Sequence, residues 1–143
     1  MNQRIPHSFY LSLIDFLMSA KQHMIAIGDE FGLTSIQTVT LLLIDKDHPR
    51  PMKSFCTLFH CDASNVTGIV DGLEKKGLVS RQNDPSDRRI KVICLEAAGR
   101  KLQQVIIDRL SDVNGFLFEP LNAIERQQFV HIVEKIAATN KLA

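Results

Sequence analysis

The fold is decided by residues 62–99, DASNVTGIVDGLEKKGLVSRQNDPSDRRIKVICLEAAG, which join a helical pattern to a pair of strand-like runs. The first half of the stretch repeats apolar residues at the i, i+3, i+4, i+7 spacing of one helical face. These residues are Val66, Ile69, Val70 and Leu73. Asp62 is a suitable N-cap, and two lysines followed by Gly77 are typical of a helix C-terminus. The pattern predicts a helix over residues 63–76.

Two short β-prone runs follow this helix, at residues 78–83 and 90–95. The segment between them reads DPSDRR, and its Asp-Pro pair favours the first two positions of a turn. We therefore predict a β-hairpin whose tip carries Arg88 and Arg89.

The polar side of the predicted helix carries short side chains. At about 100° per residue, five positions fall roughly opposite Val66. They are Ser64, Thr67, Gly68, Asp71 and Lys75. Such a face can lie close to the edges of DNA bases. Gly68 and Gly72 each cost about 1 kcal/mol relative to Ala inside a helix, so they indicate either close approach of the backbone to DNA or contact with a neighbouring helix.

Two further helices are predicted upstream. Thr34 and Gln37 have the spacing of a capping box, ahead of an apolar stripe that we expect to be buried. The stripe consists of Val39, Leu42, Leu43 and Ile44. A short helix over residues 52–59 then precedes the helix 63–76, so the order is a helix-turn-helix followed by a wing-like hairpin.

This ordered set of motifs resembles the MarR family of winged helix-turn-helix transcription regulators, from about Leu33 to the C-terminal helix. The matching residues are Leu33-Thr34 with Gln37, Ser64-Asn65-Val66-Thr67, residues 73–79 with Arg81, and residues 84–89. The resemblance implies a homodimer that binds a pseudo-palindromic operator, usually as a repressor released by a small molecule or by thiol oxidation. In the family's wing an Asp and an Arg separated by one residue occur together, and here these are Asp87 and Arg89. Gly68 and Glu96 depart from the family pattern, because many relatives carry a basic residue and a Thr there.

The expected fold is mainly α with a small β-hairpin, in which a winged helix-turn-helix domain is combined with N- and C-terminal dimerisation helices. We expect a single domain over residues 1–143, with its DNA-binding part at about 34–96. The dimerisation helices are expected at about 5–30 and 97–140.

Broad apolar stripes in the terminal segments support this division. They comprise Phe9, Leu13, Phe16, Leu17, Met24 and Ile27 near the N-terminus, then Leu102, Val105, Ile106, Leu110, Val113 and Leu117, and finally Ile124, Phe129, Ile132, Val133 and Ile136. Faces this broad imply a partner, which by the resemblance is a second subunit. The alternative is that these helices pack on their own winged domain.

The composition gives little indication of a nucleic-acid partner. Seventeen Lys and Arg residues against sixteen Asp and Glu leave a formal net charge of +1, so any positive surface must be local. Hydrophobic residues make up 45% of the chain, which is typical of a globular protein. There is no run of about 18 apolar residues and no signal-peptide pattern, so we expect a cytoplasmic protein without a membrane partner.

An enzyme is not expected. The sequence lacks GxSxG, HExxH and P-loop motifs, and no histidine is placed by sequence to activate Ser64 or Thr67. We therefore expect no catalytic residues and no cofactor.

The cysteines, Cys56, Cys61 and Cys94, do not form a CxxC motif. Cys56 and His60 have the i, i+4 spacing of a possible metal pair, but buried free cysteine commonly serves as a small apolar residue. We favour that structural role and expect no metal site. A thiol switch remains the alternative.

The DNA-contacting residues follow from these patterns and the resemblance. We expect Ser64, Asn65 and Thr67 to face the major groove, where Asn can bind adenine with two hydrogen bonds, while Gly68 lets the backbone approach. On the wing, we expect Arg89 to enter the minor groove, oriented by Asp87, and Arg88 to contact a phosphate. The alternatives to this DNA-binding regulator are a winged-helix protein-interaction module that has lost DNA binding and a thiol-based redox-sensing regulator.

Overall fold

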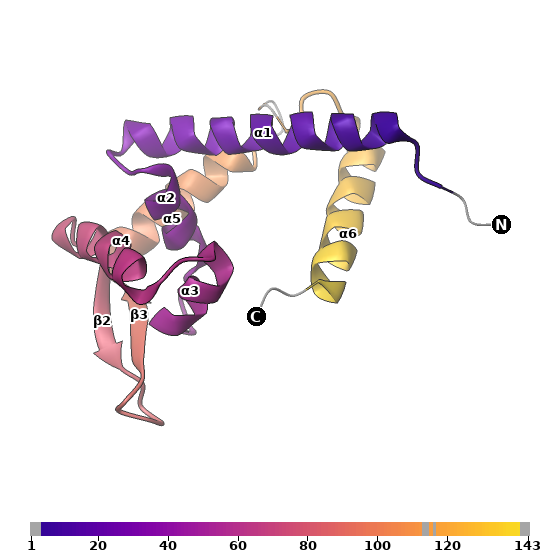
Figure 1. Cartoon of the computed structure of the whole chain (residues 1–143). Coiled ribbons are helices and arrows are strands. Elements are labelled where there is room, and N and C mark those ends of the chain that lie inside the picture. Colours follow the sequence, from indigo (N-terminus) through magenta and orange to yellow (C-terminus); the bar gives the residue numbers. More distant parts are fainter. Residues whose placement is uncertain (1–3, 113–114, 116, 141–143) are drawn as a thin grey trace.

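The computed structural model describes residues 4–112, 115 and 117–140, and Figure 1 shows its elements. In chain order they are α1 (His7–Glu30), α2 (Ser35–Leu43), β1 (Arg50–Pro51), α3 (Met52–Phe59), α4 (Ala63–Lys75), β2 (Val79–Asn83), β3 (Lys91–Leu95), α5 (Ala97–Leu110) and α6 (Ala123–Thr139). The mainly helical winged fold expected from the sequence is confirmed. The expected domain limits and the apolar residue Val113 extend beyond the described residues.

The hairpin belongs to a three-stranded antiparallel sheet with the strand order β1-β3-β2. The sequence predicted β2 and β3 but not β1, in which Arg50 pairs with Ile93 and Pro51 with Val92. A two-residue strand has no alternating pattern of its own, and its only signal is pairing with a strand some 40 residues away in sequence. Pro51 is tolerated because β1 lies at the sheet edge.

Local capping defines the helix boundaries. The Thr34 side chain accepts a hydrogen bond from the Gln37 amide at 3.3 Å, and the Gln37 side chain accepts one from the Thr34 amide at 3.0 Å, as the sequence predicted. The α3 helix is followed directly by His60, which has a left-handed φ of 49°. After α4 and its C-cap residue Lys76 comes Gly77, with a φ of +69° that favours glycine. These ends fix the chain direction on both sides of α4.

The core lies where α4 packs against α2, α3 and the sheet. Its fully buried large residues include Leu33, Leu41, Ile44, Phe55, Val70, Leu73, Ile93 and Ile106. The predicted stripe on α2 was partly wrong, because Leu43 is exposed and the buried residues include Thr38 and Thr40. Their hydroxyls donate to the carbonyls of Thr34 at 3.0 Å and Ile36 at 2.7 Å, so the threonines are buried without an unsatisfied donor.

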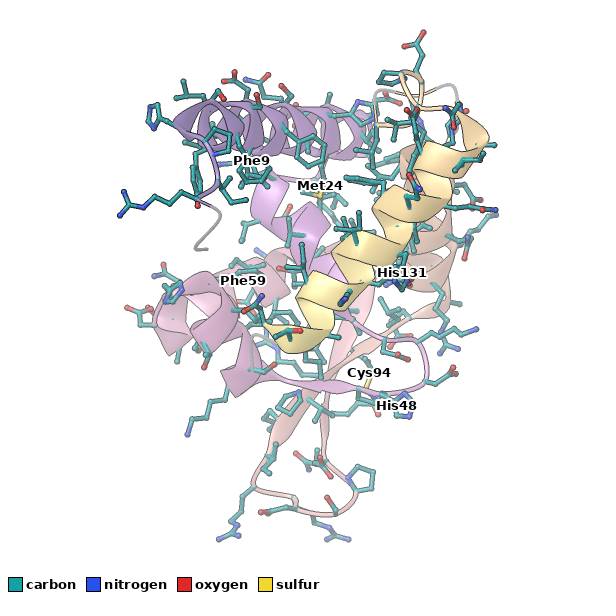
Figure 2. The ribbon with its side chains drawn as sticks, turned by 90° about the vertical axis from the view of Figure 1, so that its right-hand side faces the viewer. Phe9, Met24, His48, Phe59, Cys94 and His131 are labelled. Carbon is teal, nitrogen blue, oxygen red and sulfur yellow. The ribbon has the colours of Figure 1, made fainter. Side chains whose placement is uncertain are left out.

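The terminal helices contrast with this core. In Figure 1, α1 extends beyond the winged part. Helix α6 lies below the N-terminal half of α1, away from the sheet. Phe16 of α1 contacts Phe129 of α6 edge-on, with ring centroids 6.0 Å apart. No described residue of α6 is buried, and much of the N-terminal half of α1 is exposed as well. Figure 2 shows α6 with the side chain of His131. In the same view, α1 and the tip of the wing lie at opposite ends of the molecule.

Among the described residues, no helix combines the length and apolarity that a bilayer crossing requires.

We expect Gly99→Ala to destabilise the fold by about 2 kcal/mol or more. An added Cβ at Gly99 would lie 1.9 Å from the carbonyl oxygen of Leu78, a backbone atom that already accepts a hydrogen bond from the Glu96 amide. Gly68→Ala is the matched control, because its Cβ would meet nothing within 4 Å, and it should stabilise α4 by about 1 kcal/mol. Denaturant unfolding of both variants tests this, and equal effects at the two positions would contradict it.

Candidate nucleic-acid interface

The outward face of α4 presents Ser64, Asn65 and Gly68 to solvent, with Thr67 half-buried beside them. The Ser64 hydroxyl donates to a carboxylate oxygen of Asp62 at 2.7 Å, and the backbone N–H of Asn65 donates to the same oxygen at 3.0 Å. Both bonds hold the pKa of Asp62 below its usual value, and the bond from the Asn65 backbone N–H has the larger effect. The side chain of Ser64 is therefore part of the helix cap. The side-chain amide of Asn65, by contrast, has no hydrogen-bond partner within the described part of the chain.

The two glycines of α4 have different surroundings. A Cβ at Gly72 would lie 2.3 Å from Nε2 of Gln37, whereas a Cβ at Gly68 would meet nothing within 4 Å. Contact with the neighbouring helix α2 thus accounts for Gly72. It does not account for Gly68, which leaves bare backbone on the outward face.

An ion-pair network joins α4 to the wing. Arg81 in the middle of β2 donates to Glu74 from Nε at 3.1 Å and from a terminal nitrogen at 2.8 Å, and it also pairs with Asp71. The second carboxylate oxygen of Glu74 accepts the backbone N–H of Arg81 at 3.0 Å. The sequence placed Asp71 on the polar face of the helix but did not predict this network. The only local signal for it was that Glu74 lies seven residues before Arg81. The wing is thereby fixed relative to α4.

The wing loop fixes one arginine in an exposed position. The Arg89 guanidinium donates to both carboxylate oxygens of Asp87 at 3.0 Å, and the Arg89 backbone N–H adds a third bond at 3.0 Å. This contact lowers the pKa of Asp87 and raises the pKa of Arg89. The Arg89 side chain nevertheless remains 90% exposed. Its neighbour Arg88 is also exposed.

A cleft of about 500 Å³ lies between α3, α4 and the wing and brings these parts together. Its apolar lining consists of Pro51, Met52, Cys56, Ala63, Val66 and Ile90. Its polar lining consists of Lys53, Thr67, Arg89 and Lys91. Neither Lys53 nor Lys91 was among the DNA-binding residues predicted from the sequence. The cleft places both beside residues predicted to bind DNA, in a local cationic surface that the net charge conceals.

The cysteines are unbridged and partly buried. Burial raises the pKa of the Cys61 and Cys94 thiols, so less of each is present as the reactive thiolate at neutral pH. Within residues 4–112, 115 and 117–140, no group of three or more His, Cys, Asp or Glu side chains could hold a metal ion. These observations give the thiol-sensing alternative no support.

Comparison with known proteins places this surface in a family. The MarR family model matches residues 33–91. The transcriptional repressor NicR of Pseudomonas putida is 29% identical over 111 residues, which cover 78% of this chain and 70% of NicR. A crystal structure of MarR is 25% identical with a TM-score of 0.71, covering 97% of this chain and 93% of MarR. CouR from Rhodococcus jostii RHA1, solved bound to p-coumaroyl-CoA, is 25% identical with a TM-score of 0.70, covering 95% of this chain and 96% of CouR.

The family match spans the helix-turn-helix and most of the wing, and the likeness to the solved regulators extends over nearly the whole chain. Residues 33–91 therefore carry a MarR family domain, and the chain as a whole is similar to the winged helix-turn-helix transcription regulators of that family, which bind DNA and are not enzymes.

Proposed function

We propose that this regulator is a sequence-specific repressor that binds a pseudo-palindromic operator as a homodimer and is released by a small molecule. The observation that carries the proposal is the presence of two exposed polar groups, one on α4 and one on the wing. Asn65 offers an amide without a partner in the described chain, and Arg89 offers a guanidinium that Asp87 already orients. A base-contacting amide and a pre-oriented cation are the two groups that a winged helix needs for two different grooves.

In the major groove, Asn65 is proposed to bind an adenine edge with its amide. The half-buried Thr67 is proposed to contact a base or a phosphate with its hydroxyl. Ser64 donates to Asp62, but its oxygen keeps lone pairs that can accept a hydrogen bond from a base. Gly68 lets the backbone of α4 lie close to the groove floor, which supplies the reason for a glycine that no contact with the described residues explains.

At the wing, Arg89 is proposed to enter the minor groove, where a narrow A·T-rich geometry attracts a guanidinium. Arg88, Lys53 and Lys91 are proposed to bind phosphates, which position the protein without reading the sequence.

The homodimer is supported by exposed apolar side chains on the terminal helices. They include Phe9, Leu13, Ile14, Leu17 and Met18 on α1, and Ile124, Val130, Ile132, Val133 and Ile136 on α6. These side chains do not cover the winged domain of their own chain, as the alternative interpretation required. A second subunit would bury the apolar faces of both helices and place two α4 helices on one side of the duplex, about 10 base pairs apart.

The proposed effector is a small molecule. CouR was solved with p-coumaroyl-CoA, which supports a small-molecule effector here without naming its chemistry. Binding of an operator by the purified protein separates this proposal from the interaction module that has lost DNA binding, because only the former gives a salt-dependent gel shift. A repressor of this kind acts in the cytoplasm, where it reaches its operator.

The dimer is tested by Leu17→Glu, which places a carboxylate on the proposed interface at a side chain that is 55% exposed in the single chain. We expect sedimentation of the wild type at micromolar concentration to give a dimer and the variant to shift toward monomer, because burying an unpaired charge is costly. Gln22→Glu introduces the same carboxylate at another exposed position of α1 and should leave the dimer intact. A monomeric wild type would contradict the proposal.

The two DNA-contacting elements are expected to differ in their energetics. Asn65→Ala should cost about 1–3 kcal/mol on the operator and much less on random DNA, because it removes a base contact. Arg89→Ala should lower the slope of log K against log salt by about 1 per subunit and weaken binding most where the flanks are A·T-rich. Fluorescence anisotropy across a salt series measures both, with Lys21→Ala on α1 as the control for loss of a distant charge. Equal losses on operator and random DNA for Asn65→Ala would show that α4 was assigned the wrong role.

Gly68→Ala is expected to separate stability from affinity. The added methyl group should stabilise α4, yet it should weaken operator binding about tenfold or more by holding the backbone away from the bases. Thermal unfolding and operator titration of the same sample measure the two effects. Unchanged affinity in the stabilised variant would exclude close approach at this position.

A further inference from the structure

The end of α2 is capped by a side chain from a distant helix. Gln103 lies half-buried on α5, and its Nε2 donates to the carbonyl oxygens of Leu41 and Ile44, both at 2.8 Å. These bonds span 62 and 59 residues of sequence. A glutamine amide has two hydrogens, and here both are used on one helix end.

The end of α2 needs these donors. The last carbonyls of a helix have no partner within it, and α2 is followed by the extended C-cap residue Ile44 and has no basic residue in its last turn. Leu41 is 0% exposed and Ile44 is 1% exposed, so water does not reach these residues. Loss of the Gln103 amide would leave buried acceptors unsatisfied.

The helix that carries Gln103 contacts both functional halves of the molecule. Near its start, Gly99 packs against the backbone of Leu78 at the base of the wing. Near its end, Arg109 forms an ion pair with Glu30 of α1. Between these points Ile106 is completely buried in the core. Helix α5 therefore runs from the wing to the proposed dimerisation helices, with α2 attached midway.

Helix α2 in turn packs against α4, where Gly72 lies beside the Gln37 side chain. A continuous series of contacts thus leads from α1 and α5 through Gln103 and α2 to α4.

We propose that Gln103 is a positioning residue that fixes the helix-turn-helix relative to the dimerisation helices and so sets the distance between the two α4 helices of the dimer. This inference rests on the proposed homodimer and operator. Hydrophobic contacts such as those of Ile106 resist separation of the helices, but the hydrophobic effect itself is non-directional. Two hydrogen bonds from one planar amide define a position along the helix axis.

The experiment measures how strongly the protein discriminates between half-site spacings. Operator variants carry the spacing preferred by the wild type or that spacing with one base pair added or removed, which shifts a half-site by about 3.4 Å and rotates it by about 35°. Gln103→Glu keeps the shape of the side chain but replaces the donor with an acceptor. Gln103→Lys keeps a donor and serves as the rescue.

We expect Gln103→Glu to lose about threefold or more of the affinity ratio between the preferred and altered spacings, while remaining a dimer by sedimentation. Gln103→Lys should retain most of that ratio. The matched control is Gln104→Glu, because the Gln104 amide donates at 2.8 Å to Asp108 within the exposed face of α5 itself. This control should behave as the wild type.

Two outcomes would overturn the inference. Equal loss of affinity at every spacing would mean that Gln103 only stabilises the end of α2, and an unchanged ratio would mean that it positions nothing. If Gln103→Glu does not fold, Gln103→Met removes the donors without adding a charge and is held to the same criterion. Failure of the wild type to dimerise or to bind any operator would instead refute the proposed function, so the two failures are distinguishable.

Discussion

Val70 and Leu73 of α4 are completely buried against α2, α3 and the sheet, and the other parts of the molecule depend on this contact. Burial of one face determines which residues of α4 remain outside, because residues three or four apart share a face of a helix. Ser64, Asn65 and Gly68 are exposed for this reason. The Arg81 network then attaches the wing to the partly exposed flank of the same helix, so that helix and wing form one rigid surface.

The features that sequence analysis predicted correctly depend on residues close together in the chain. The Thr34 and Gln37 capping box, the Asp62 cap and the left-handed Gly77 each involve neighbours within about one helical turn. The pairing of Asp87 with Arg89 spans two residues and was given by the family resemblance. Such features can be predicted from sequence because the local backbone conformation alone brings the partners into contact.

The features that were missed depend on tertiary contacts. The strand β1 exists only through pairing with β3, and the bonds of Gln103 join residues about 60 positions apart. The burial of Thr38 was missed because threonine is usually exposed, and its hydrogen bond to a helical carbonyl offsets the cost only inside a formed helix. The candidate site was predictable where it lies on α4 and the wing. Lys53 joins it only because α3 packs beside α4.

The exposed apolar surface of α1 and α6 bears on how the stability of the protein depends on its concentration. If a second copy buries this surface, folding and association become one equilibrium, and the free energy of unfolding depends on protein concentration. Dilution of the protein would then leave a larger fraction of the chains dissociated, with α1 and α6 exposed to proteolysis. The amount of this protein would thus be set partly by its own quaternary structure.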